Sequence, residues 1–402
     1  MTNIVCIICD DLGRGDVGWL GLRTRPSVTP RLDALAANSQ VLSEFCSNGP
    51  LCSPTRAALL TGRYQQRCGI TGVISAANHR DVGLAVETPT ISAALKDAGY
   101  ATALFGKWHL GYDVKYGPTR FGFDRFRGFV SGNVDYVSKI DQAGYADWRE
   151  GEEQITETDY LTECITDHAC KWIREQTGPF FCLIAHGAPH YPYQVPGDPA
   201  GRSVGNVGEL RGVGYKNQDA YDAMLRSLDE QVGRVADLLD QQGLADDTLF
   251  IFTSDHGCPK DMGDNGPVRG HKGTLYEGGI RVPTFVRWPG QLEAGERTDL
   301  CTTVDLTATM AAAAAARVPQ MDGESLLGDL PDRILCWEYS SRRAARQGSW
   351  KWVDDGEGPE LFDLADDPAE QLDRLAREPD LAQRLADAWN AWKADVGDLQ
   401  LT

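Results

Sequence analysis

The segment Asn3-Ile4-Val5-Cys6-Ile7-Ile8-Cys9 is an apolar run that ends directly at two carboxylates, Asp10 and Asp11. Such a run, rich in β-branched residues and without alternating polar side chains, is typical of a strand buried on both faces. The sequence predicts similar strands at residues 101–105, 180–185 and 248–253. Helices are predicted between the strands, at residues 29–37, 88–98, 160–175 and 219–242. This alternation indicates an α/β fold, in which a large, mostly parallel sheet lies between layers of helices.

The pattern changes after residue 300. An Ala-rich helix is expected at residues 301–315, and a last helix at 380–395. Between them, short strands bounded by Gly and charged turns are predicted at 334–338, 350–353 and 360–363. We therefore predict a large N-terminal domain of residues 1–315, which carries the sheet, and a small C-terminal α+β domain of residues 316–402, with a short antiparallel sheet.

Composition restricts the partners of the protein. The 402 residues carry a formal net charge of -19, which disfavours binding to nucleic acid. No stretch has the length of uninterrupted apolar residues that a membrane span needs, so no membrane partner is expected. The first residues lack a leader pattern, so we expect a cytoplasmic protein, or a periplasmic or secreted one if a leader has been removed. Eleven cysteines, an odd number, indicate reduced thiols.

Polar clusters directly follow the four predicted strands. They are Asp10-Asp11, Gly106-Lys107-Trp108-His109, the segment 186–190 and Ser254-Asp255-His256. In parallel sheets the ligand lies outside the carboxyl ends of the strands, so these clusters should meet at one rim. Adjacent carboxylates repel each other unless a cation lies between them, which favours a divalent metal site. The alternative for each acidic pair is a solvated turn or a helix N-cap.

The segment Leu51-Cys52-Ser53-Pro54-Thr55-Arg56 places a thiol at the N-terminus of a predicted helix. The helix dipole favours an anion there, and Arg56 lies one turn further on the same face. These residues predict an activated nucleophile beside a guanidinium that binds anions.

The same segment, continued by Ala-Ala-Leu-Leu-Thr-Gly-Arg, resembles the signature of the type I, formylglycine-dependent sulfatases of the alkaline-phosphatase-like superfamily. In that family a formylglycine-generating enzyme converts the cysteine to an aldehyde. Thr55 replaces the more usual Ser and leaves the Cys-x-Pro-x-Arg pattern intact. Further segments are similar to family motifs in the same order, at residues 7–13, 105–111, 188–190, 253–257, 272–283 and 360–364.

The resemblance implies a metal site, a cationic clamp and two histidines that handle protons. The implied metal ligands are Asp10, Asp11, Asp255, His256 and the modified Cys52. The metal is expected to be Ca²⁺, with Mn²⁺ as the alternative, because His256 stands where many family members carry Asn. The other implied site residues are Arg56 beside the diol, Lys107 and Lys272 on the sulfate, His109 as proton acceptor, His190 at the sulfate or the leaving oxygen, and His271 against the substrate.

The implied activity is hydrolysis of a sulfate monoester, on a sulfated carbohydrate or an aryl sulfate. One hydroxyl of the hydrated aldehyde would attack sulfur, activated by the metal. One alternative is a phosphonate monoester or phosphodiester hydrolase, since the same groups accept either tetrahedral anion. Another is a non-catalytic sulfated-glycan-binding protein in which Cys52 stays a thiol. Substrate identity is expected to reside in loops 73–82, 130–151 and 191–216.

Overall fold

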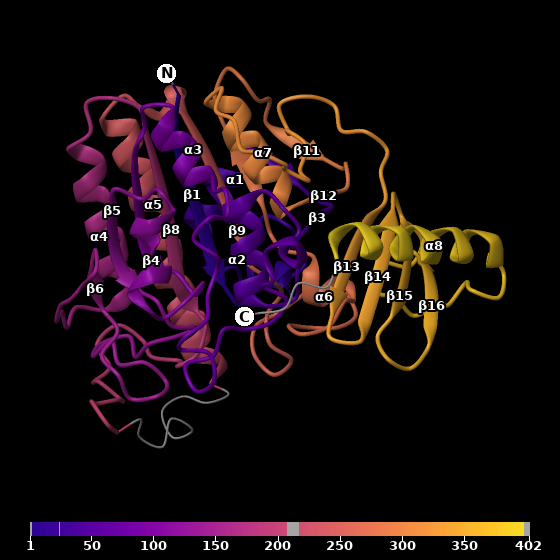
Figure 1. Ribbon diagram of the computed structural model, residues 1–402, viewed down its shortest axis with the longest axis horizontal. Coiled ribbons are helices and arrows are strands. Elements are labelled where there is room, and N and C mark those ends of the chain that lie inside the picture. Colours follow the sequence, from indigo (N-terminus) through magenta and orange to yellow (C-terminus); the bar gives the residue numbers. More distant parts are fainter. Residues whose placement is uncertain (1, 24, 207–216, 398–402) are drawn as a thin grey trace.

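The computed structural model describes residues 2–23, 25–206 and 217–397 and confirms the predicted α/β architecture (Figure 1). The part of loop 191–216 from residue 207 lies outside the described residues. A ten-stranded mixed sheet has the order β11-β2-β10-β9-β1-β8-β4-β5-β6-β7. Its five central strands are parallel: β9 (Thr248–Ser254), β1 (Asn3–Asp10), β8 (Phe180–Pro189), β4 (Ala101–Lys107) and β5 (Arg125–Phe129). The outer strands are β11 (Gly295–Arg297), β2 (Gln40–Leu42) and β10 (Phe285–Arg287) on one side, and β6 (Arg149–Glu150) and β7 (Glu153–Gln154) on the other.

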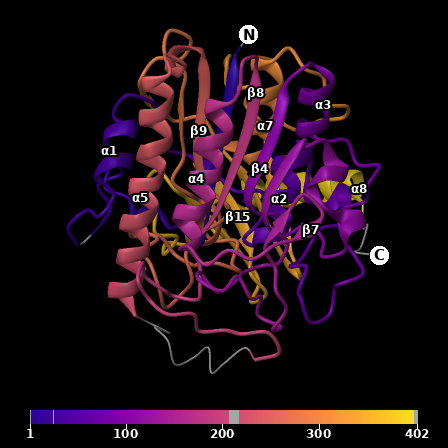
Figure 2. The same ribbon diagram turned by 90° about the vertical axis from the view of Figure 1, so that its left-hand side faces the viewer.

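The two faces of β1 pack against different helices. Val5, Ile7 and Cys9 share one core with α1 (Pro30–Ala36), α4 (Leu161–Arg174) and α5 (Gln218–Gln241), which cover the near side of the sheet in Figure 2. The alternate residues of β1 pack against α2 (Cys52–Thr61), α3 (Ile91–Asp97) and α7 (Thr303–Ala313). Cys6 and Cys9 therefore lie on opposite faces, as the two-residue period of a strand requires.

The predicted helix at residues 301–315 begins two residues late. Cys301–Thr302 is a short strand, β12, which pairs with β3 (Phe45–Cys46), and α7 follows it. The reason is a cap: the backbone N–H of Thr302 donates to the Asp305 carboxylate at 2.7 Å, which starts the helix at Thr303. Buried residues of α7, and beyond it Val318 and Leu326, join the core of the large sheet. The domain boundary at residue 315 stays a prediction.

The C-terminal part holds the predicted antiparallel sheet, which has four strands: β13 (Leu335–Tyr339), β14 (Arg342–Gln347), β15 (Trp350–Asp354) and β16 (Pro359–Asp363). Helix α8 (Pro379–Val396) covers one face, as seen at the right of Figure 1. The other face packs against Cys46 and α6 (Glu277–Ile280) of the large unit. Sequence analysis missed β14, because its arginines give no apolar pattern, although Ala344 and Ala345 are fully buried.

Single-turn 3-10 helices complete the described elements, at Arg14–Asp16, Gln65–Cys68, Val114–Tyr116, Pro118–Phe121 and Ala245–Asp247. Among the described residues, no helix combines the length and apolar character needed to cross a bilayer. All eleven cysteines are free thiols, as predicted.

Candidate active site

The polar clusters meet at the carboxyl ends of the central strands, as predicted. In the parallel ladders, Cys9 of β1 lies beside Ser254 of β9, and Asp10 lies beside Pro189 of β8. Lys107 ends β4, and Gly106 before it permits a close approach of β8. A Cβ on Gly106 would lie 2.1 Å from a carbonyl oxygen of β8, and the φ of this residue is 105°.

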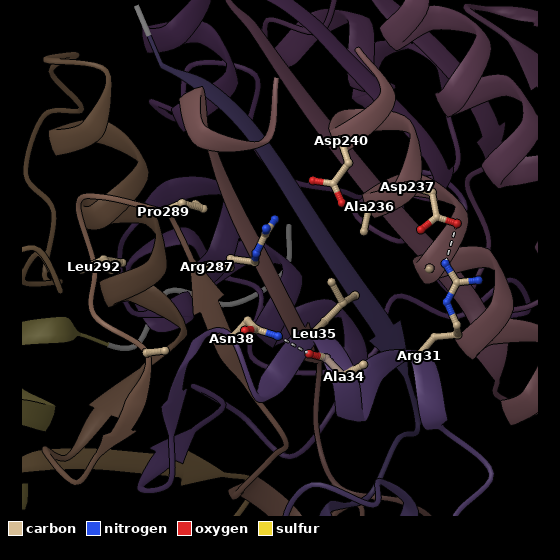
Figure 3. Close-up of a pocket in the computed structure, with 12 residues that line it drawn as sticks. Arg31, Ala34, Leu35, Asn38, Ala236, Asp237, Asp240, Arg287, Pro289 and Leu292 are labelled. Atoms are coloured by element: carbon tan, nitrogen blue, oxygen red, sulfur yellow. Dashed lines mark hydrogen bonds and ion pairs between the residues drawn. The ribbon is translucent and has the colours of Figure 1, made fainter. Parts of the chain in front are cut away.

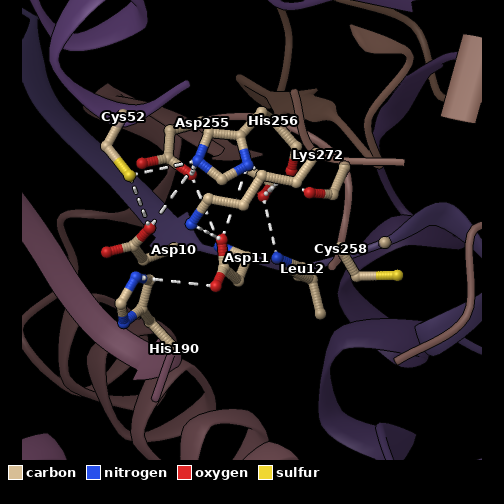
Figure 4. Close-up of polar contacts among 12 residues, drawn as sticks. Asp10, Asp11, Leu12, Cys52, His190, Asp255, His256, Cys258 and Lys272 are labelled. Carbon is tan, nitrogen blue, oxygen red and sulfur yellow. Dashed lines mark hydrogen bonds and ion pairs between the residues drawn. The ribbon is translucent and has the colours of Figure 1, made fainter. Parts of the chain in front are cut away.

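Four predicted ligands form a compact, fully buried group (Figure 4). Cys52 Sγ lies 3.3 Å from Asp10 Oδ1 and 3.1 Å from His256 Nε2. His256 Nε2 lies 3.3 Å from Asp255 Oδ1. Asp11 borders the group, with Oδ1 3.5 Å from His256 Nδ1. Three carboxylates and one imidazole around a small volume are a donor set that fits a divalent cation.

The protonation of His256 follows from its hydrogen bonds. His256 Nδ1 lies 2.9 Å from the carbonyl oxygen of Gly257, which can only accept. Nδ1 therefore carries the proton, and Nε2 directs its lone pair at Cys52 and Asp255. A backbone carbonyl that orients the far nitrogen is the usual arrangement for a metal-binding histidine.

Three cations surround the carboxylates. Lys107 Nζ donates to Asp10, and Lys272 Nζ lies 2.6 Å from Asp11 Oδ1. Arg56 donates to Asp255 Oδ2 at 3.0 Å and to the Lys107 carbonyl oxygen at 3.2 Å. Burial alone would raise the pKa of Asp10, but the charge of Lys107 in particular holds it well below its usual range. The site is thus a buried, charge-balanced cluster that can take both a cation and an anion.

His109 is a buried, neutral imidazole with one nitrogen that carries no proton. Its Nε2 lies 3.0 Å from the carbonyl oxygen of Ile74, so Nε2 carries the proton. Nδ1 is buried, has no hydrogen-bond partner among the described residues, and keeps a free lone pair. Burial, followed by the charges of Lys107 and Arg56, lowers the pKa of His109 well below its usual range, so the ring is neutral. Its backbone is left-handed, with a φ of 60°, an uncommon conformation outside glycine that is concentrated at functional sites.

His190 and His271 lie closer to the rim. His190 Nδ1 lies 2.6 Å from the carbonyl oxygen of Tyr191, which leaves Nε2 facing Asp11 Oδ2 at 3.6 Å. His271 Nδ1 lies 2.8 Å from the carbonyl oxygen of Lys272, its own neighbour in the chain. His190 therefore belongs to the carboxylate cluster, whereas a substrate contact of His271 stays a prediction.

The unmodified Cys52 thiol is not the activated nucleophile that its helix N-terminus predicts. Burial, and then the charge of Asp10, raises the pKa of Cys52 far above its usual value. The helix dipole is too small to offset both effects. Cys52 thus lies at the centre of the site as a protonated thiol, unable to attack a substrate in that form.

Sequence analysis missed several groups that position the site. Tyr221 of α5 donates to the Asp11 carbonyl oxygen at 2.9 Å and to Asp16 Oδ2 at 2.6 Å. Ser254 Oγ accepts the Leu12 N–H at 3.2 Å. Tyr221 occupies a core position of an amphipathic helix, where its hydroxyl gives no periodic signal.

A separate cavity of about 480 Å³ lies between α1, α5 and β10 (Figure 3). Its polar lining includes Arg31, Asp237, Asp240 and Arg287, and Arg31 pairs with Asp237 at 2.6 Å. It contains none of the predicted site residues.

Comparison with known proteins shows to which family the chain belongs. Residues 2–316 match the family described as Sulfatase. The N-acetylgalactosamine-6-sulfatase of Rattus norvegicus is 33% identical over 391 residues, covering 87% of this chain and 70% of that protein. Arylsulfatase A of Homo sapiens is 33% identical over 355 residues, covering 81% and 66%. The crystal structure of Ps i-CgsB in complex with k-i-k-neocarrahexaose is 27% identical, with a TM-score of 0.87, and covers 99% of this chain and 94% of that one. The chain belongs to the sulfatase family, whose members are sulfuric ester hydrolases.

Proposed function

We propose that this sulfatase removes sulfate from a sulfated saccharide, with Cys52 converted to formylglycine and Ca²⁺ held by Asp10, Asp11, Asp255 and His256. The observation that carries the proposal is the position of Cys52. Its sulfur lies 3.3 Å from Asp10 and 3.1 Å from His256, inside a buried ligand group. A formylglycine-generating enzyme is then the maturation partner.

When present, the ion and the hydrated aldehyde would supply the Lewis acid and the attacking hydroxyl. The chain's own residues do the rest. Lys107 and Lys272 bring two ammonium groups to the carboxylates, where they bind the oxygens of the substrate anion. His109 accepts a proton at Nδ1, the atom left free by its bond to Ile74. Arg56 fixes Asp255 and so the shape of the ligand group.

His190 is suited to the leaving oxygen. Its Nδ1 proton is held by the Tyr191 carbonyl, and Nε2 faces the cluster from the partly exposed side. In the protonated form, Nε2 donates a proton to the departing alcohol. Burial lowers the pKa of His190, while the charges of Asp11 and Asp10 oppose this.

A saccharide is the substrate class that the relatives support. One relative is named an N-acetylgalactosamine-6-sulfatase, and Ps i-CgsB was solved with a neocarrahexaose. A 6-sulfated N-acetylgalactosamine is therefore the first natural substrate to test, followed by sulfated oligosaccharides. Ca²⁺ is the proposed ion because three carboxylates supply oxygen ligands, and Mn²⁺ is the alternative because His256 supplies nitrogen.

Two measurements test the proposal. Mass spectrometry of the peptide with residue 52, from protein co-expressed with a formylglycine-generating enzyme, should show the aldehyde. The second measurement is the ratio of kcat/KM for 4-nitrophenyl sulfate to kcat/KM for a phenyl phosphonate ester, with the same enzyme preparation. We expect this ratio to be well above one. A ratio well below one would reassign the chain to phosphonate or phosphodiester hydrolysis, with Mn²⁺ at His256. An unmodified thiol with tight binding of sulfated glycans and no turnover would make it a binding protein.

A further inference from the structure

We propose that Glu157, Cys164 and His168 form a second metal site, for a thiophilic divalent ion of which zinc fits best. Cys164 and His168 are four residues apart on α4, so both side chains lie on one helix face, and Glu157 precedes the helix. A sulfur, an imidazole nitrogen and a carboxylate oxygen of the three residues all lie within 4.8 Å of one another. This site shares no residue with the active site.

The carboxylate of Glu157 is held in place by hydrogen bonds from Trp148 and Arg127. Oε2 accepts hydrogen bonds from Trp148 Nε1 at 2.8 Å and from Arg127 Nη2 at 2.9 Å. His168 Nε2 faces the same carboxylate and lies 2.9 Å from Oε1 and 3.1 Å from Oε2. Metal-binding carboxylates are commonly held by such outer donors, here Trp148 and Arg127.

The donor set selects the metal. A thiolate and an imidazole are ligands for zinc and other transition ions, whereas calcium and magnesium prefer oxygen alone. Three protein ligands leave one tetrahedral position for water. At zinc bond lengths the nitrogen and oxygen would lie about 3.3 Å apart, so the 2.9 Å separation of His168 Nε2 and Glu157 Oε1 opens only slightly.

Burial and charge also suit an ion here. Cys164 is almost fully buried, whereas the side chains of Glu157 and His168 are 16% and 21% exposed, so an ion has a way in. On binding, the Cys164 thiol releases its proton, and the imidazole proton of His168 moves from Nε2 to Nδ1. The thiolate and the carboxylate then neutralise the two charges of the ion. Arg127 stays paired with Glu157 Oε2.

The ion would brace one wall of the active site. Trp148, which donates to Glu157, follows Asp147, whose carboxylate accepts the N–H groups of Val130 and Ser131. The next residue, Gly132, lies against His109, because a Cβ there would be 2.9 Å from His109 Nε2. A metal at Glu157 thus ties α4 to the loop that borders the proposed base.

The test is a Co²⁺ titration of the full chain with Cys52→Ser, which leaves the catalytic group without sulfur. A thiolate bound to Co²⁺ gives a charge-transfer band in the near ultraviolet, and we expect this band to saturate at the intensity of one Co²⁺–thiolate bond per chain. It should vanish with Cys164→Ser added, and should persist with the matched control Cys170→Ser, another buried cysteine of α4. Circular dichroism verifies that each variant is folded.

A second variant keeps the result decisive if Cys164→Ser misfolds. Trp148→Phe removes the N–H that anchors Glu157 Oε2 and keeps the thiol, and should weaken Co²⁺ binding about 10- to 100-fold. Zn²⁺ should compete for the Co²⁺ and abolish the band. The proposed site would be overturned if the Cys52→Ser protein gave no band, or if the band were fully retained after Cys164→Ser was added. Unchanged Co²⁺ affinity in the Trp148→Phe variant would also overturn it.

Discussion

Glu370→Gln should make the stability of the protein less sensitive to pH. Glu370 and Glu277 are both fully buried and share the ammonium of Lys351, at 2.8 Å and 2.9 Å. Glu277 also pairs with Arg346 at 3.0 Å, so Glu277 keeps its charge and Glu370 is the carboxylate that protonates first. Burial above all, with a contribution from the charge of Glu277, raises the pKa of Glu370 from 4.5 to about 7, although Lys351 opposes this.

The direction of the pH dependence follows from the linkage between proton binding and folding. A carboxyl group whose pKa is raised by folding binds its proton more tightly in the folded state. The stability that the Glu370 proton contributes is therefore fully present below pH 4.5 and is lost as the pH rises through about 7. A change from 4.5 to about 7 corresponds to about 3 kcal/mol of unfolding free energy. For a chain of 402 residues, the unfolding entropy converts this into about 4 °C in Tm.

The assay is differential scanning calorimetry of the wild type and Glu370→Gln at pH 5 and pH 8. Because the window from pH 5 to pH 8 covers most but not all of this change, the variant should gain about 3 °C in Tm relative to the wild type, since it carries no ionisable group there. Glu293→Gln, at an exposed position, is the matched control and should show no such gain. The same Tm difference at both pH values for Glu370→Gln would refute the buried, shared-lysine reasoning.

Further predictions concern the active site. Cys52→Ala should abolish sulfatase turnover with an unchanged circular dichroism spectrum, and more than trace activity would contradict the formylglycine proposal. His109→Ala should lower kcat by about 10²- to 10⁴-fold with little change in KM, and a purely KM effect in steady-state kinetics would remove it as the base. Lys272→Ala should raise KM and lower kcat together, because its charge meets the anion in both states; an unchanged KM would argue against that role. Dialysis against a chelator should reduce kcat at least about 100-fold, restored by Ca²⁺ more than by Mn²⁺, and full retained activity would exclude a catalytic metal.

Sequence alone predicted the parts of the fold that are long and buried. Strands β1, β4, β8 and β9 are apolar over nearly their whole length, so their pattern is unambiguous. The short outer strands β2, β10 and β11 were missed, because three residues carry too little periodicity and their pairing depends on neighbours distant in sequence. Tertiary contacts, not local preference, decide these elements.

For the active site too, the residue types could be predicted from the sequence, whereas features that depend on tertiary contacts could not. The motifs supplied residue types, and the parallel strand order explains why Asp10, Lys107 and Asp255 meet. Protonation could not be predicted, since it depends on backbone carbonyls such as that of Ile74, which lies 35 residues before His109 and has no sequence signature. The inert state of the Cys52 thiol was equally hidden, because burial depends on the folded chain.

The small C-terminal unit takes part in holding Lys272, the lysine proposed to bind the sulfate group. The loop of Lys272 is fixed on one side, where the Gly273 N–H donates to the Pro50 carbonyl at 3.1 Å, just before Cys52. On the other side, Arg342 of β14 donates to the Gly273 carbonyl at 3.1 Å. A few residues further, the Glu277 carboxylate accepts from Lys351 and Arg346 of the small sheet.

Without that sheet, Glu277 would lose Lys351 and Arg346, two of its buried cationic partners, and the lysine loop would lose its hydrogen bond from Arg342. Breaking a buried pair costs about 3 to 5 kcal/mol, because the remaining charge stays desolvated. The geometry of Lys272 against Asp11, at 2.6 Å, therefore depends on both units at once. The small sheet thus supports the loop of Lys272 through Arg342, from outside the proposed ligand group.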